Sequence, residues 1–81
     1  KGTANSSWVP VRTIFVEALR YEAVYMILIH NHPSGCPEPS REDLVITKQI
    51  KEAGELLGIP LSDHIIIGDK CYTSLREQQM M

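Results

Sequence analysis

Residues 23–43, AVYMILIHNHPSGCPEPSRED, give the clearest indication of the fold of this 81-residue chain. They open with a continuous apolar run, Ala23–Ile29, that is rich in residues preferring β-structure. An apolar run of this length predicts a strand that is covered on both faces. The following residues 30–39 contain three prolines and one glycine, which exclude a helix or a central strand. The segment therefore predicts a buried strand that ends in a rigid loop.

A helix is expected after this loop. Ser40 and Asp43 have the spacing of a capping box, although Glu or Gln is the usual second partner, and Gly58 is a natural C-terminal stop. The apolar stripe of this helix is predicted to consist of Ile46, Ile50, Ala53 and Leu57. On a helical wheel Asp43 falls within roughly 80° of this stripe, so we expect its carboxylate to face the sheet.

The rest of the sequence predicts further helical and extended segments. Pro10 is suited to the first turn of a helix, and helical spacing relates the apolar residues that follow it, Val11, Ile14, Phe15, Ala18 and Leu19. Short strands are predicted at Asp63–Gly68 and Cys71–Ser74, and a frayed helical tail at Leu75–Met81. The order helix, strand, helix, strand indicates an α/β layered fold. Residues 1–81 allow one small domain.

Composition narrows the classes of protein to consider. With 43% hydrophobic and 22% charged residues, the chain is expected to be globular. Its net charge of -2 supplies no basic surface, so we do not expect nucleic acid as a partner of this domain alone. No apolar run approaches the ~18–20 residues of a membrane span, so no membrane partner is expected.

Cysteine usage and the first residues indicate the context of the domain. Cys36 and Cys71 form no CxxC pair, and we expect free thiols in a reducing cytoplasm. The sequence begins with neither a signal peptide nor an initiator Met. We therefore expect the C-terminal part of a longer, cytoplasmic chain.

His30, His32 and Asp43 are the candidate metal ligands. Residues two apart in a strand share a face, so both imidazoles can point the same way at the strand's carboxyl end. A carboxylate on the buried side of a helix is costly unless it is paired, hydrogen-bonded or metal-bound. Zinc accepts neutral His nitrogen and Asp oxygen, and three protein ligands leave one tetrahedral position for a water whose pKa falls to about 7. The pattern predicts a catalytic zinc site.

Each of these residues has a simpler alternative. Asp43 could only complement the helix N-terminus, which is worth ~0.3–1 kcal/mol, and each histidine could be an ordinary hydrogen-bonded side chain. Cys36 could be a spare ligand or an oxidation-sensitive thiol, although H-x-H-x3-C is not a recognised zinc spacing. His64 is expected to be a structural hydrogen-bonding residue.

The spacing of the candidate ligands resembles a known signature. His30-Asn-His32, seven further residues, Ser40, two residues and Asp43 resemble the JAMM (MPN+/JAB) metalloprotease motif. The chain is more closely similar to the bacterial RadC-like JAB domain, and the strings that carry this resemblance are Gly2-Thr3 with Asn5-Ser6-Ser7, His30–Gly35, Pro39–Asp43, Ala53-Gly54-Glu55 and Asp63–Gly68. The resemblance covers nearly the whole chain.

The resemblance implies a three-layer α/β/α sandwich, similar to the cytidine-deaminase-like JAB/MPN fold and here truncated at its N-terminus. It implies a zinc metallopeptidase in which His30, His32 and Asp43 hold the metal, and Ser40 stabilises the oxyanion. The general base of such enzymes is a glutamate on an earlier strand, which we expect to lie outside this chain. Glu17 is expected to face solvent. Among the other glutamates, Glu22 lies at the wrong end of the strand, and Glu38 and Glu42 are expected to be solvated.

Two functions from different classes follow. The first is a zinc-dependent hydrolase that cleaves an amide bond in a peptide or isopeptide-linked substrate. The second is a non-catalytic or DNA-repair-associated metal-binding module, which the family's DNA-repair name suggests. A sheet edge near residues 1–9 could also pair with a second copy, giving a homo-oligomer.

Overall fold

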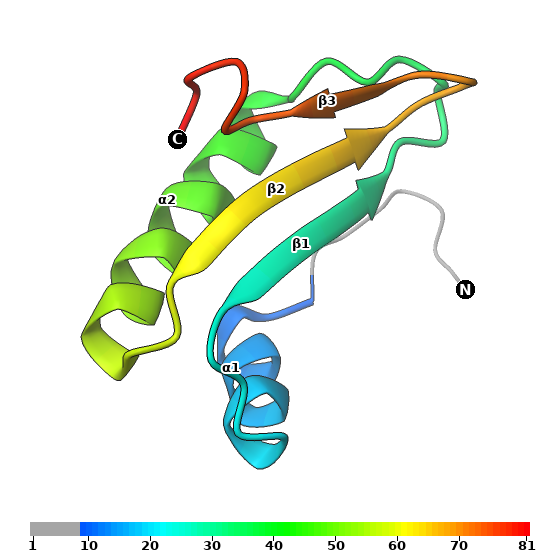
Figure 1. The fold of residues 1–81 in the computed structure, drawn as a ribbon. Helices are drawn as coiled ribbons and strands as arrows, with labels where there is room; N and C mark the ends of the chain where they lie inside the picture. Colours follow the sequence, from blue (N-terminus) through cyan, green and yellow to red (C-terminus); the bar gives the residue numbers. More distant parts are fainter. Residues whose placement is uncertain (1–8) are drawn as a thin grey trace.

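A computed structural model describes residues 9–81 of the chain, so the edge expected near residues 1–9 lies almost entirely outside the described residues. In this part the elements are α1 (Val11–Arg20), β1 (Met26–Asn31), α2 (Arg41–Leu57), β2 (Leu61–Ile67) and β3 (Tyr72–Ser74). The sheet order is β1-β2-β3, as Figure 1 shows, with β1 parallel to β2 and β3 antiparallel to β2. The α/β class predicted from the sequence is confirmed. Since α2 connects two parallel neighbours, β1 and β2 end at the same edge of the sheet.

The two helices pack against one core. Phe15 from α1, Ile50 from α2 and Leu61 from β2 form its buried centre. Partly buried hydrophobic residues surround this centre, namely Val11, Ile14, Met26, Leu28, Ile46, Ala53 and Met81. Met81, the last residue of the tail that was expected to fray, packs its side chain against this cluster.

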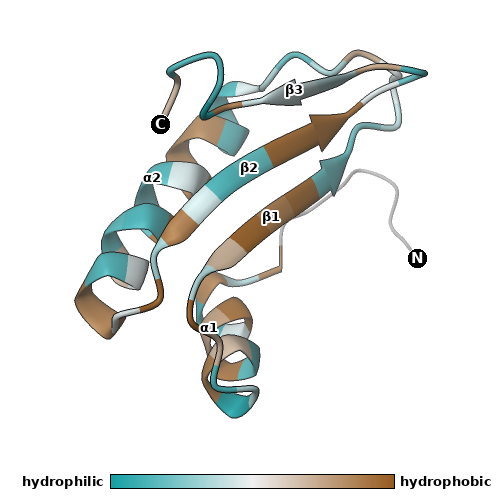
Figure 2. Cartoon of the chain, viewed as in Figure 1, coloured by the Kyte–Doolittle hydropathy of each residue, from teal (hydrophilic) through white to brown (hydrophobic). Residues whose placement is uncertain are grey.

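The opposite face of the sheet is open within residues 9–81. Exposed and partly buried residues alternate along β1, and the side chains of Ile27 and Ile29 are 47% and 66% exposed. The prediction that this strand is covered on both faces is therefore wrong for the described residues, because none of their helices lies over that face. Residues 9–81 supply two of the three layers that the resemblance implies. Figure 2 shows that β1 is apolar along most of its length, whereas β2 has a hydrophilic stretch between its two apolar ends.

Several boundaries predicted from the sequence differ from the structure. The first strand begins at Met26 instead of Ala23 and extends through His30 to Asn31. This extension occurs because β1 stays paired with β2 up to Asn31↔Ile67. The tail predicted as a helix is a series of turns, since Leu75 is fully buried and its N–H donates to the carbonyl of His64. The other strands shift by one or two residues.

Helix α2 has both predicted ends. Ser40 caps its N-terminus in a capping box with Asp43, and Gly58 ends it with a φ of 77°. Gly54 lets the helix approach the following connection, since a Cβ there would lie 2.4 Å from the carbonyl oxygen of Ile59. Leu57, which was predicted to join the apolar stripe, is 47% exposed, and Leu19 of α1 is likewise half exposed. The close approach at Gly54 holds α2 against the start of β2, and Asp43 lies in the first turn of this helix.

None of the helices within residues 9–81 has the length and apolar character needed to cross a membrane.

Candidate metal centre

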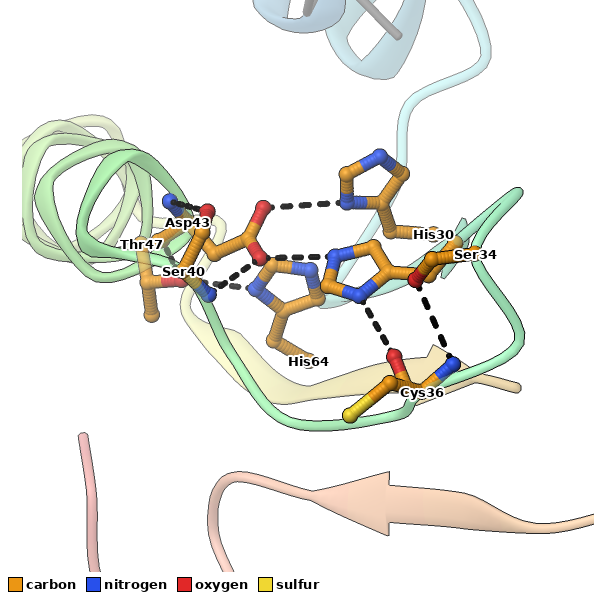
Figure 3. A network of polar contacts seen from close by, with 8 residues as sticks. His30, Ser34, Cys36, Ser40, Asp43, Thr47 and His64 are labelled. Carbon is orange, nitrogen blue, oxygen red and sulfur yellow. Dashed lines mark hydrogen bonds and ion pairs between the residues drawn. The ribbon is translucent and has the colours of Figure 1, made fainter.

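The edge where β1 ends brings His30, His32 and Asp43 together. One potential ligand atom from each residue lies within 4.8 Å of the other two. His30 ends the apolar part of β1, His32 follows the strand, and Asp43 comes from the first turn of α2. Figure 3 shows the Asp43 carboxylate directed at the imidazoles. The grouping predicted from the sequence is thus present in the fold.

Both histidines lie on the side of β1 that faces α2. Their rings meet edge to face, with centroids 4.9 Å apart and an interplanar angle of 87°. This arrangement follows from the alternation of side chains along a strand, which the short Asn31 spacer preserves. Both side chains are largely buried, with 15% and 14% exposure.

Asp43 is 1% exposed and uses both oxygens of its carboxylate. Its Oδ1 lies 3.1 Å from Nδ1 of His30, and its Oδ2 lies 2.8 Å from Nε2 of His32. Oδ2 also accepts a hydrogen bond from the backbone N–H of Ser40 at 2.8 Å. The carboxylate therefore serves as a helix cap and faces the imidazoles as well, so the capping alternative does not exclude a ligand role.

The loop orients His32. Its Nδ1 lies 2.8 Å from the carbonyl oxygen of Cys36, which can only accept, so Nδ1 is the donor. A neutral His32 then presents the lone pair of Nε2 to Oδ2 of Asp43. Two acceptors 2.8 Å apart require a proton or a cation between them. A metal-binding histidine usually donates its other ring N–H to a carboxylate, a backbone carbonyl or a water, which fixes the orientation of the imidazole.

A second pair of polar side chains lies behind Asp43. The hydroxyl of Thr47 donates to the backbone carbonyl of Asp43 at 2.6 Å and lies 2.6 Å from Nδ1 of His64. His64 is fully buried, and burial is the main cause that lowers its pKa below the ordinary value of 6.5. The prediction of a structural, hydrogen-bonding His64 is confirmed. Its partner Thr47 was not found from the sequence, where the two residues belong to different elements.

Sequence reasoning also missed the support of the loop. The N–H of Asp69 donates to the carbonyl of Gly35 at 2.8 Å, and a Cβ on Gly68 would lie 2.4 Å from the same oxygen. The loop that carries Cys36 therefore rests on the turn after β2. The sequence predicts Gly68 only as the last residue of a short strand. Its contact with Gly35 spans more than 30 positions, so no local pattern indicates it.

A cavity of about 420 Å³ opens in front of the candidate ligands, and Ser34, Ser40 and Glu42 line it. The oxygen of Ser40 accepts from the N–H of Asp43 at 3.1 Å, so the hydroxyl proton remains available as a donor. Glu42 is exposed, as predicted. Cys36 contributes its carbonyl to the site, and both it and Cys71 are free and exposed.

The remaining glutamates behave as expected. Glu17 is exposed on α1 and lies 3.6 Å from the Arg20 guanidinium. Glu22 occupies the turn before β1, at the end of the strand away from the candidate ligands. Helix α1 itself lies beside that end of the sheet in Figure 1. Neither carboxylate is among the residues that gather around Asp43.

An α/β domain in which a buried carboxylate faces two imidazoles belongs to the class of candidate metal-binding domains. The family model described as the RadC-like JAB domain matches residues 1–80, and the chain belongs to this family.

Curated relatives agree with this assignment. A UPF0758 protein of Desulforamulus reducens is 56% identical over 80 residues, covering 99% of this chain and 35% of the relative. A UPF0758 protein of Alkaliphilus metalliredigens is 55% identical over 80 residues, covering 99% of this chain and 34% of the relative. A third, from Bacillus licheniformis, is 54% identical over 77 residues, covering 95% and 34%. The chain spans about a third of the length of these relatives.

Proposed function

We propose that this domain binds one zinc ion through His30, His32 and Asp43 and serves a hydrolase that cleaves an amide bond in a peptide or isopeptide-linked substrate. The observation that carries the proposal is the buried Asp43 carboxylate, whose oxygens lie 3.1 and 2.8 Å from the two imidazoles. Family membership supports the hydrolase class. The free, exposed thiols of Cys36 and Cys71 support a reducing, cytoplasmic setting.

The donor set fits zinc. Two imidazoles and one carboxylate are the ligand types that zinc uses in catalytic sites, where a fourth position stays open. When bound, zinc would supply Lewis-acid chemistry that activates a water and polarises a carbonyl group. The cavity in front of the three residues provides space for a substrate chain.

Orientation of His32, stabilisation of the oxyanion and proton transfer would each fall to a protein residue. Cys36 holds His32 in the tautomer that presents Nε2 to the centre. Ser40 has a hydroxyl proton that is not needed for its capping bond, so it would donate to the developing oxyanion from the cavity wall. The proton transfer itself would fall to a glutamate on an earlier strand, as the resemblance implies.

The first test is metal content. The purified whole protein should contain about one zinc per chain by elemental analysis, and His32→Ala and Asp43→Ala should lose it. Glu42→Gln is the matched control, because Glu42 lines the same cavity but lies outside the ligand group. An unchanged zinc content in both ligand variants would refute the metal assignment.

The second test is activity. Hydrolysis of peptide and isopeptide-linked substrates is expected from the whole protein, with loss of activity in chelator and recovery on adding zinc. If zinc is bound stoichiometrically and a broad panel of such substrates stays intact, the hydrolase part of the proposal is wrong and a non-catalytic metal-binding module replaces it.

A further inference from the structure

We propose that Thr47 and His64 are positioning residues that set the place of Asp43 in the candidate metal centre. The inference rests on the proposed zinc function and deepens it. It is carried by two hydrogen bonds, each 2.6 Å long, that connect β2 to the backbone of Asp43 through the hydroxyl of Thr47. Both side chains are buried, with 2% exposure for Thr47 and 0% for His64.

The donor and the acceptor of each of these two hydrogen bonds can be assigned. The Asp43 carbonyl can only accept, so the single hydroxyl proton of Thr47 is used on it. The Nδ1 atom of His64 must then donate to Oγ1 of Thr47. The result is a directed series from His64 through Thr47 to Asp43, in which each bond polarises the next.

The position of His64 links both sides of the candidate centre. In β2 it is paired in register with Leu28 of β1, two residues before His30. Its ring stacks against that of His30, with centroids 6.3 Å apart and an interplanar angle of 25°. One buried imidazole therefore contacts the strand that carries His30 and, through Thr47, the helical turn that carries Asp43.

This geometry places a limit on how Asp43 can move. Residues four apart lie on one face of a helix, so Thr47 stands directly behind Asp43 on the side facing the sheet. The capping box fixes the N-terminal side of the same turn through Ser40. The Thr47–His64 contact fixes its depth against the sheet, and hence the separation between the Asp43 carboxylate and the imidazoles.

The test compares paired variants of the whole protein, with metal affinity measured by chelator competition for zinc. Thr47→Val and His64→Leu remove the chain of hydrogen bonds and should lower zinc affinity by about tenfold or more. Thr47→Ser keeps the hydroxyl, and His64→Asn keeps an N–H donor near Nδ1, so both should stay within about threefold of wild type. Ile50→Val is the stability control, because it removes one methylene from the buried face of the same helix.

The absorption spectrum of the cobalt-substituted protein gives a readout that lost stability alone would not change. The visible bands should shift or weaken in Thr47→Val and remain as in wild type in Thr47→Ser and Ile50→Val. Wild-type affinity and an unchanged spectrum in both Thr47→Val and His64→Leu would overturn the inference. Failure of the wild-type protein to bind zinc or cobalt would instead overturn the proposed function.

Discussion

Replacing Gly68 by alanine tests whether the turn after β2 supports the candidate metal centre. A Cβ at this position would lie 2.4 Å from the Gly35 carbonyl oxygen and 2.9 Å from the ring of Pro37. Both contacts are shorter than the separations that side chains tolerate, and both involve parts of the loop that cannot rotate away. The loop must therefore shift by roughly half an ångström or more, which moves the carbonyl of Cys36 away from His32.

The magnitude follows from two contributions. Overpacking of a closely fitted contact costs about 1–3 kcal/mol. Weakening of the bond from the Asp69 N–H to Gly35, now 2.8 Å long, costs about 0.5–1.5 kcal/mol. We expect Gly68→Ala to lower the free energy of unfolding by about 2–4 kcal/mol, measured by urea denaturation. Zinc affinity should fall by about tenfold, because His32 loses its orienting carbonyl.

Gly58→Ala is the matched control. Gly58 has a φ of 77°, where alanine is strained, but no atom lies within 4 Å of the added Cβ. That variant should lose about 1–2 kcal/mol of stability with no change in zinc affinity. If Gly68→Ala unfolds like wild type and binds zinc equally well, the loop does not rest on this turn in the way the contacts indicate.

Three further predictions concern single side chains. Burial is the main cause that lowers the pKa of His64, so below pH 6.5 the unfolded chain takes up a proton at this residue that the folded chain does not. The contribution of neutral His64 to stability is therefore fully present above pH 6.5 and is lost as the pH falls further, and urea titrations in chelator should show a smaller decline in His64→Asn. Ser40→Ala should lower the melting temperature, because the helix loses about 1 kcal/mol of capping free energy. Ser40→Asp can cap the helix but cannot donate a hydrogen bond to the oxyanion, so it should keep the melting temperature and lose hydrolysis. Asp63→Ala should lower the free energy of unfolding by about 1–3 kcal/mol in denaturant titrations. The Asp63 carboxylate accepts hydrogen bonds from the Ser74 hydroxyl at 2.6 Å and from the backbone N–H groups of His64 and Arg76. A loss smaller than that of the exposed control Glu52→Ala would contradict this prediction.

The face of the sheet that carries Ile27 and Ile29 shows the limit of reading burial from sequence. The apolar run predicts a strand correctly, since strand formation depends on residues that are neighbours along the chain. Whether a second layer covers that strand depends on elements far away in sequence. Within residues 9–81 both helices pack on the other face, and the side chain of Ile29 stays 66% exposed.

The local features of the candidate site were readable from the sequence because each depends on residues a few positions apart. The capping box between Ser40 and Asp43, the stop at Gly58 and the common face of His30 and His32 are all of this kind. They follow from the fixed periods of helices and strands.

The residues that support the site come together through contacts between distant parts of the chain. The parallel register of β1 and β2 places His64 behind His30, and the crossover of α2 brings Thr47 to His64. The same pairing puts Gly68 under the loop at Gly35. These contacts join residues 17 to more than 30 positions apart, and no periodicity along the chain specifies them. Local sequence patterns thus predict which groups are available to a metal, and the packing of α2 on the sheet sets how these groups are held.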